Sequence, residues 1–194
     1  YVVSTAPTDN TITEIRSLQT KVRLPRYGVF KPTFYGYNRY GVLVLKNVEG
    51  VKQTVDAKVG EVLADGSFFA SGNQSGVITA SYNGATEKIE VELLPEAPVA
   101  IRLDSVLLDN KVAYPIEVQT EVGGNVFNLY PGAMQWDVAD PSVCTVNEGV
   151  VKGLRNGTTI VTGRLGNFTD LLKVHIEIAD KPSLTARAFT DATW

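Results

Sequence analysis

The chain has 194 residues, of which 44% are hydrophobic and 20% charged, and its formal net charge is -3. This composition is typical of a globular protein, and no apolar run approaches the ~20 residues that a membrane-spanning helix needs, so we expect no direct membrane insertion. Charges of both signs are interspersed, which gives no electrostatic reason to expect nucleic acid as a partner.

The first ten residues resemble a connection to something upstream. The chain begins at Tyr1 without a methionine or a signal-peptide pattern, and Tyr1–Ser4 resembles the end of a strand. A Pro/Asp/Asn cluster follows at 6–10, and it predicts a stiff joint because proline restricts both itself and the residue before it. We therefore expect residues 1–10 to be the tail of an upstream domain or a linker.

The next segment, 27–40, is the richest in aromatic residues and holds six of the seventeen in the chain. In one interpretation Phe30, Phe34 and Tyr40 belong to the core, while the other tyrosines line a strand edge or an interface with a neighbouring domain. In the other, exposed tyrosines bind sugar rings or a partner, because an aromatic face with a polar tip suits a wet recognition surface. The candidate binding residues are Tyr27, Tyr35, Tyr37, Arg39 and Tyr40.

The interface interpretation is the one we favour for this segment. Six aromatic residues offer more apolar area than one edge of a domain of about 85 residues needs, and monomers seldom leave a patch of more than a few hundred Å² uncovered. We therefore expect Tyr35 and Tyr37 to be shielded by a neighbouring domain.

An internal repeat divides the chain into two copies. Residues 62–93 and 146–178 share the same order of a turn glycine, a short apolar run, a glycine-rich turn, a β-branched strand and an alternating final strand. Gly66 and Gly149 are 83 residues apart, and Gly76 and Gly157 are 81 residues apart. The repeating unit is therefore a whole small domain rather than one turn of a solenoid.

Strand signals recur every 8 to 12 residues, and no window longer than two turns has helical periodicity. The final strand of each copy alternates apolar and polar residues, at 88–93 and at 173–178, as expected for a strand with one wet face. Proline-containing joints follow at 95–98 and 179–183. The pattern predicts an all-β chain of two tandem sandwiches at 11–94 and 97–179, with residues 180–194 as a linker and the start of a further β element.

The run from Trp136 to Gly163 resembles the bacterial immunoglobulin-like group 2 family. The matching elements are a tryptophan, an Asp-Pro-Ser-Val turn, a valine–glycine–valine step and a Gly-Thr strand, found at Trp136, Asp140–Val143, Val146–Val150 and Gly157–Ile160. The first copy is more divergent, because it lacks the tryptophan and the Asp-Pro-Ser turn. The resemblance implies two immunoglobulin-like β-sandwiches, with Trp136 as a core residue of the second.

A broader resemblance concerns the order of segments: YVVSTAPTDNTITEIRS, then LPRYGVFKPTFYGYNRYGVLV, then a domain of this type. It is similar to the region that follows the catalytic domain in secreted phosphodiester glycosidase-like proteins of Bacteroidetes. The resemblance implies an accessory region whose catalytic domain lies upstream. It transfers no catalytic residue, because the active-site motifs of that family are absent from these residues.

The residue types of catalytic and metal sites are scarce. Cys144 is the sole cysteine and we expect it to be a small buried hydrophobic residue, while His175 is the sole histidine and reads as part of the polar face of a strand. The scattered carboxylates lack the spacing of a calcium loop, and no pair of residues offers a nucleophile with an oriented base. We expect no catalytic residues, no metal site and no cofactor.

These observations favour a non-catalytic spacer that positions neighbouring upstream and downstream domains of a secreted, periplasmic or surface-attached bacterial protein. The first alternative is a carbohydrate-binding or adhesive module that uses the aromatic residues of 27–40. The second is the accessory part of a phosphodiester glycosidase-like enzyme.

Overall fold

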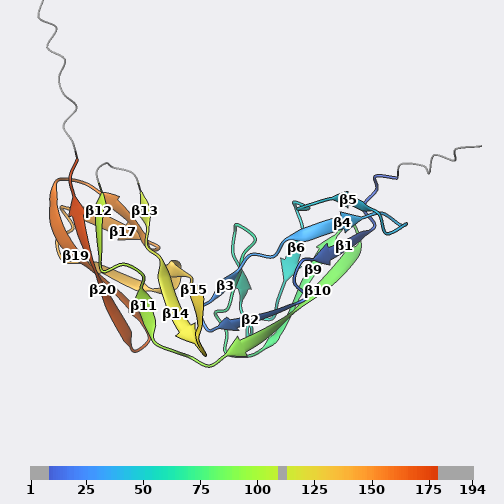
Figure 1. Cartoon of the computed structure of the whole chain (residues 1–194), viewed down its shortest axis with the longest axis horizontal. Helices are drawn as coiled ribbons and strands as arrows, with labels where there is room; N and C mark the ends of the chain where they lie inside the picture. Colours follow the sequence, from blue (N-terminus) through green and yellow to red (C-terminus); the bar gives the residue numbers. More distant parts are fainter. Residues whose placement is uncertain (1–8, 109–112, 179–194) are drawn as a thin grey trace, which may run out of the picture.

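The computed structural model describes residues 9–108 and 113–178. Expectations for the first eight residues and for 180–194 lie outside the described residues. The described chain is all β apart from one 3-10 turn, η1 (Pro131–Ala133), and it forms two tandem sandwiches (Figure 1). The expected fold class, two tandem immunoglobulin-like β-sandwiches, is confirmed, while the domain limits 11–94 and 97–179 stay predictions.

Each sandwich has ten strands among the residues that the structure describes. The strands of the first are β1 (Glu14–Ser17), β2 (Lys21–Pro25), β3 (Val29–Phe30), β4 (Phe34–Tyr37), β5 (Leu43–Leu45), β6 (Lys52–Thr54), β7 (Glu61–Val62), β8 (Phe68–Phe69), β9 (Gly76–Tyr82) and β10 (Ala85–Leu94). Those of the second are β11 (Val99–Ile101), β12 (Ser105–Leu108), β13 (Tyr114–Pro115), β14 (Val118–Val122), β15 (Asn125–Leu129), β16 (Gln135–Val138), β17 (Cys144–Asn147), β18 (Val150–Gly153), β19 (Gly157–Leu165) and β20 (Phe168–Ile176).

The two sandwiches have the same topology, strand for strand. Their sheet orders are β2-β10-β9-β6, β1-β4-β5 and β3-β8-β7 in the first, and β12-β20-β19-β16, β11-β14-β15 and β13-β18-β17 in the second. In both, the second strand pairs in parallel with the last strand, which pairs antiparallel with the one before it. The sequence repeat is therefore a repeat of the whole fold.

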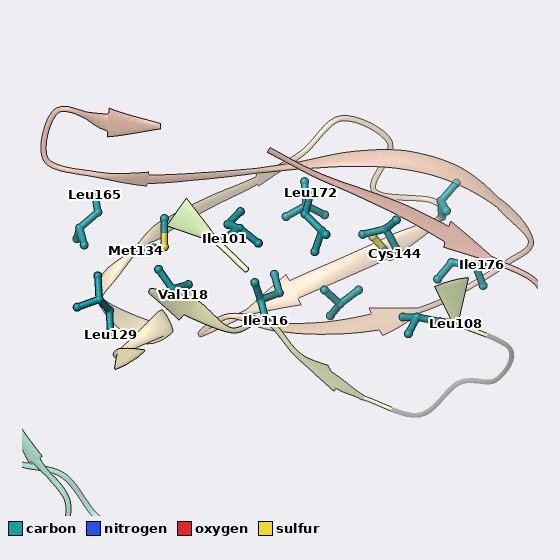
Figure 2. Packing of buried hydrophobic residues seen from close by; sticks show 14 residues of the cluster. Ile101, Leu108, Ile116, Val118, Leu129, Met134, Cys144, Leu165, Leu172 and Ile176 are labelled. Atoms are coloured by element: carbon teal, nitrogen blue, oxygen red, sulfur yellow. The ribbon is translucent and has the colours of Figure 1, made fainter. Parts of the chain in front are cut away.

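Alternation along the long hairpins builds each core. In β9 and β10 of the first sandwich Ile78 and Ile89 have no exposed surface, and in β19 and β20 of the second Val161 and Val174 have none. Their neighbours in sequence face water, as the period of two requires. The fourteen buried residues of the second core lie between its sheets (Figure 2). Burying one such side chain stabilises the fold by about 1.5–3 kcal/mol.

Trp136 lies at the margin of the second core and not inside it. Its ring is half-buried, packs against the core and covers Gly163, where an added Cβ would lie 2.8 Å from a ring carbon. The indole N–H donates a hydrogen bond to the carbonyl of Pro131 at 2.9 Å. That polar partner lies outside the core, which is why the ring is not fully enclosed.

Cys144 has no exposed surface, as expected for a small buried hydrophobic residue. In the run 142–146 an alternating strand would place Val143 on the face opposite Cys144, but Val143 is buried as well. Val143 precedes β17, in a turn where its N–H donates to the carbonyl of Asp140. Turn geometry therefore replaces the strand period at that position.

Candidate functional site

The two sandwiches are joined by backbone hydrogen bonds as well as by the linker at 95–98. Tyr27, between β2 and β3, donates its N–H to the carbonyl of Ala70 at 2.8 Å, and its own carbonyl accepts from the N–H of Tyr130 at 2.9 Å. The next residue, Gly28, forms an antiparallel bridge with Leu129 of β15. One short turn of the first domain is thus tied to the second domain.

Tyr27 has φ 68°, a left-handed conformation that bulky residues seldom adopt. A strained residue persists where its surroundings hold it in place. The two hydrogen bonds of its backbone, one to each domain, supply that constraint.

Aromatic packing surrounds the backbone bridge. The rings of Phe69 and Tyr130, one from each domain, lie 4.9 Å apart at 60°, and the rings of Phe69 and Tyr27 lie 6.5 Å apart. Tyr27 packs against the core of the second domain, and Phe127 of β15 packs against the core of the first. Each domain therefore completes the packing of the other.

An ion pair and a small cavity flank this junction. Arg26 reaches Glu96 of the linker, with Nη1 2.9 Å from Oε1, and its guanidinium lies 4.7 Å from the centre of the Tyr27 ring. The cavity has a volume of about 260 Å³, and its lining includes Arg26, Glu96, Thr120 and Phe168. The linker is thus tied to the first domain at the point where it crosses to the second.

The five candidate binding residues do not form one surface. Tyr27 lies at the junction, whereas β4 and the turn that follows it carry the other four at the far end of the first sandwich (Figure 1). Tyr35 and Tyr37 share the outer face of β4 and are half-buried. Whether a neighbouring domain shields them further stays a prediction.

Tyr40 is 58% exposed, so the expectation that it is a core residue was wrong. It follows the end of β4 in a tight turn, where Asn38 accepts hydrogen bonds from the N–H groups of Tyr40 and Val42. The turn directs the tyrosine away from the core. Phe34 is 3% exposed and Phe30 packs against the same core, so the rest of that expectation is confirmed.

Arginine side chains cover one face of two of these tyrosines. The guanidinium of Arg16 lies 4.3 Å from the ring centre of Tyr37, and that of Arg39 lies 4.8 Å from the ring centre of Tyr40. Arg39 is also paired with Asp9 at 3.2 Å. Hydrogen bonds from Thr11 are the main cause of the lowered pKa of Asp9, with Arg39 a smaller cause.

The same sheet face in the second domain is polar. The strand register places Arg102, Glu117, Gln119 and Asn128 where the first domain has Arg16, Tyr35, Tyr37 and Leu43. Arg102 pairs with Glu117, and Gln119 donates to Asn128 at 3.1 Å. The aromatic face is therefore particular to the first copy and is not a requirement of the fold.

The sequence reading missed one close pair, Thr158 and His175, whose Oγ1 and Nδ1 atoms lie 2.6 Å apart. The pair brings a hydroxyl beside a base, but it does not supply the oriented base that the expectation concerned. Both side chains are exposed, and among the described residues no carboxylate is hydrogen-bonded to the other ring nitrogen of His175. The Gly166-Asn167 turn sets the hairpin register and was the signal that could have revealed the pair.

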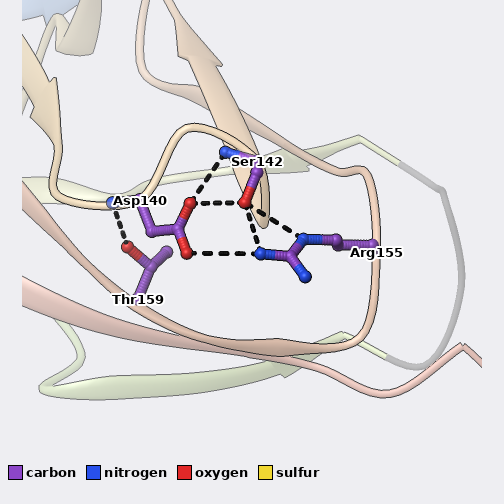
Figure 3. A network of polar contacts seen from close by, with 4 residues as sticks. All are labelled: Asp140, Ser142, Arg155 and Thr159. Atoms are coloured by element: carbon purple, nitrogen blue, oxygen red, sulfur yellow. Dashed lines mark hydrogen bonds and ion pairs between the residues drawn. The ribbon is translucent and has the colours of Figure 1, made fainter.

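The turn at Asp140 is held by hydrogen bonds and an ion pair of the Asp140 residue (Figure 3). The Asp140 carboxylate accepts from the N–H and hydroxyl of Ser142, and Arg155 lies 3.5 Å from its other oxygen. The Asp140 N–H donates to the hydroxyl of the buried Thr159 at 2.8 Å. These contacts lower the pKa of Asp140, chiefly through the Ser142 hydrogen bonds.

Neither metal-binding clusters nor membrane-spanning helices occur in the part of the chain that the structure describes. Within 9–108 and 113–178, no three His, Cys, Asp or Glu side chains are grouped so that they could hold a metal ion. No helix in these ranges is long and apolar enough to cross a bilayer.

No protein-family model and no curated protein sequence matches the chain. Among solved structures, domains 5-6 of the S-layer protein SbsC are 15% identical over 88% of this chain and 99% of theirs, with a TM-score of 0.40. The titin Ig tandem A164-A165 is 13% identical over 86% of this chain and 97% of its own, with a TM-score of 0.30.

The chain spans 28% of the longer S-layer structure rSbsC, to which it is 16% identical over 88% of its own length with a TM-score of 0.36. At these identities and TM-scores the likeness carries no argument about function, and membership of the group 2 family stays a prediction.

Proposed function

We propose that this chain is a non-catalytic spacer that holds neighbouring domains of a secreted, periplasmic or surface-attached bacterial protein at a set geometry. The observation that carries the proposal is the backbone bridge through Tyr27 and Gly28, which ties the two sandwiches together. The working units are the sandwiches at 11–94 and 97–179.

A spacer transmits position only if its joints do not bend freely. A four-residue linker that contains Pro95 and Pro98 is extended and semi-rigid, but it still allows rotation about its non-proline bonds. The Tyr27–Tyr130 hydrogen bond and the Phe69–Tyr130 ring contact remove that freedom, because both must break for the angle to change. The junction therefore holds the interdomain angle more tightly than the linker alone would.

The experiment measures the distribution of distances between spin labels at Lys52→Cys and Lys152→Cys, exposed strand residues in different domains. We expect one narrow distribution. The double substitution Tyr27→Gly with Tyr130→Ala keeps the positive φ but removes both rings, and should broaden it. Tyr40→Ala, an aromatic change remote from the junction, is the control. A broad distribution in the unsubstituted chain would contradict the proposal.

The neighbour that this spacer contacts is expected at the far end of the first sandwich. Five exposed apolar side chains gather in and beside the sheet that carries Tyr35 and Tyr37: Leu18, Tyr40, Val42, Leu43 and Leu45. An upstream domain of the same polypeptide would cover them. Replacing Tyr35 and Tyr37 with serine should weaken docking in the full-length protein and leave both sandwiches folded.

Glycan binding is the second candidate, and the 58% exposure of Tyr40 favours it. Its ring could stack on a sugar through the face that Arg39 leaves open. A glycan array on the chain distinguishes the two functions. Binding lost in Tyr40→Ala and kept in Tyr82→Ala would support the carbohydrate-binding function over the spacer.

The accessory role in a phosphodiester glycosidase-like protein is compatible with the spacer and is tested by the full-length reading frame. We expect the chain itself to hydrolyse neither phosphodiester-linked sugars nor ordinary glycosides. The exposed Thr158–His175 pair is the one position to check. Turnover that disappears in Thr158→Val would overturn the non-catalytic assignment.

A further inference from the structure

The outer face of the four-stranded sheet in the second domain exposes three aliphatic side chains. Leu107 of β12 is 59% exposed, Leu171 of β20 is 53% exposed and Ile160 of β19 is 37% exposed. They lie around Lys173 and His175, because the register pairs Leu107 with His175, and Ile160 with Lys173. We call these five residues, together with Glu177, the leucine face.

The first domain provides an internal comparison for this face. The register of β2, β9 and β10 places Lys21, Thr79 and Thr86 at the positions that Leu107, Ile160 and Leu171 occupy in the second domain. At one position the first domain is the more apolar of the two, because it has Val77 where the second domain has Thr158. The fold itself accepts polar residues at these positions, so the aliphatic residues of the second copy need another reason.

The charges of the leucine face also differ from those of its counterpart. In the first domain Glu92 is paired with Lys21 at 3.0 Å and with Arg23 at 3.1 Å. Glu177 occupies the place of Glu92, and the lysine has become Leu107. Among the described residues, neither Glu177 nor Lys173 takes part in an ion pair. The face therefore presents one charge of each sign, Lys173 on β20 and Glu177 directly after it.

We propose that a second copy of this chain covers the leucine face, in a two-fold dimer of the second domain. Lys173 of β20 and Glu177, the residue directly after β20, lie two residues to either side of His175, so the period of two places them on the same face. A two-fold axis near His175 places Lys173 of each copy opposite Glu177 of the other. The face is then complementary to itself in charge, as an isologous interface requires, and Leu107 and Thr158 lie on either side of His175 at the axis.

The size of the face indicates a dimer that dissociates on dilution. Four strands spaced ~4.8 Å apart and up to nine residues long cover an area of about 600 Å². Stable complexes bury about 800 Å² on each partner. The dimer should therefore form in a concentration-dependent way.

The tyrosine-bearing face of the first domain is the other apolar surface that could cover the leucine face. That contact would be heterologous, and repetition of it would grow chains of molecules instead of closing at two. The two-fold arrangement avoids this consequence.

Sedimentation equilibrium at a series of protein concentrations tests the proposal. The series extends to about 1 mM, because a weak but specific dimer has a dissociation constant of up to about that value. We expect a monomer–dimer equilibrium without larger species. Leu107→Lys and Leu171→Thr introduce the residues that the first domain carries at these positions, so they should fold, and each should weaken the dimer about tenfold or more. A chain that stays monomeric throughout, or that grows beyond the dimer, overturns the proposal.

Charge reversal makes the test specific for the two-fold geometry. Lys173→Glu and Glu177→Lys should each weaken the dimer about tenfold, because each places like charges opposite each other. The double variant K173E/E177K restores opposite charges and should recover the dimer. Lys88→Glu, at the matching position of the first domain, is the control and should have no effect. A double variant as weak as the single ones overturns the two-fold arrangement.

Discussion

Tyr27 adopts φ 68° at the position where its carbonyl accepts a backbone hydrogen bond from Tyr130 of the second domain. Glycine or asparagine would adopt that conformation at lower cost, since a bulky residue there costs on the order of 1–3 kcal/mol. The ring offsets the cost, because it packs on the core of the second domain and beside Phe69. The backbone strain at Tyr27 is thus offset by the contact that its ring makes with the other domain.

Trp136 tests how much a residue at the margin of the core contributes. Trp136→Ala should lower the free energy of unfolding of the second domain by about 2–4 kcal/mol, somewhat less than for a fully buried aromatic residue. Trp136→Phe keeps most of the packing and loses the hydrogen bond to Pro131, and should cost about 1 kcal/mol. Calorimetry of the second transition measures both. A Trp136→Ala chain that melts like the unsubstituted one would contradict this placement.

Cys144 should be unreactive in the folded chain. Burial, and to a lesser degree the charge of Asp140, raises the pKa of the thiol, so little of the reactive thiolate is present at neutral pH. We expect a thiol reagent such as Ellman's reagent to label Cys144 only as fast as the second domain unfolds. The same chain in denaturant, labelled at once, is the control, and rapid labelling of the native chain would rule out the buried placement.

Among the elements, the long hairpins were the most predictable from sequence. Alternation at 88–93 and 173–178 identified their inward residues, and the repeat identified the shared topology. The short strands were less predictable, because β3, β7, β8 and β13 have only two residues each and no period can be recognised in so few. Their pairing depends on contacts across the sandwich rather than on local pattern.

The Asp140 turn predicts a pH dependence for the element that joins β16 to β17. Hydrogen bonds from Ser142 lower the pKa of Asp140 in the folded chain, whereas the unfolded value is about 3.9. The carboxylate therefore contributes stability above about pH 4, and that contribution is lost as the pH falls through the lower folded pKa. At pH 7 the Asp140→Asn chain should have a lower melting temperature than the unsubstituted chain. In strong acid the two melting temperatures should be equal.

Thermal melts from pH 7 downward measure this difference. Asp137→Asn is the control, since Asp137 is exposed on β16 and accepts none of these hydrogen bonds. A difference between Asp140→Asn and the unsubstituted chain that stays constant over the whole pH range would show that the charge of Asp140 has no part in it.

At the scale of the whole molecule, the sequence predicted a joint but placed it only in the linker. The proline pattern at 95–98 was visible, whereas the bridge joins residue 28 to residue 129, about a hundred positions apart. No local pattern reports a contact of that separation. The sequence pattern also groups the aromatic segment 27–40 as one unit, whereas the structure separates Tyr27 from Tyr35, Tyr37 and Tyr40.

The junction makes the stability of one domain depend on residues of the other. Tyr27 belongs to the first sandwich but packs on the core of the second. Tyr27→Ala should therefore lower the free energy of unfolding of the second domain by about 1–2 kcal/mol, the contribution of a half-buried aromatic ring. Phe127 of the second domain packs on the core of the first, so Phe127→Ala should lower the free energy of unfolding of the first domain. Tyr40→Ala, in the same domain as Tyr27 but remote from the junction, should leave the second transition unchanged. Calorimetry of the tandem chain, compared with residues 97–178 alone, measures these effects, and a second domain that melts identically with and without Tyr27 would show that the sandwiches are coupled only through their linker.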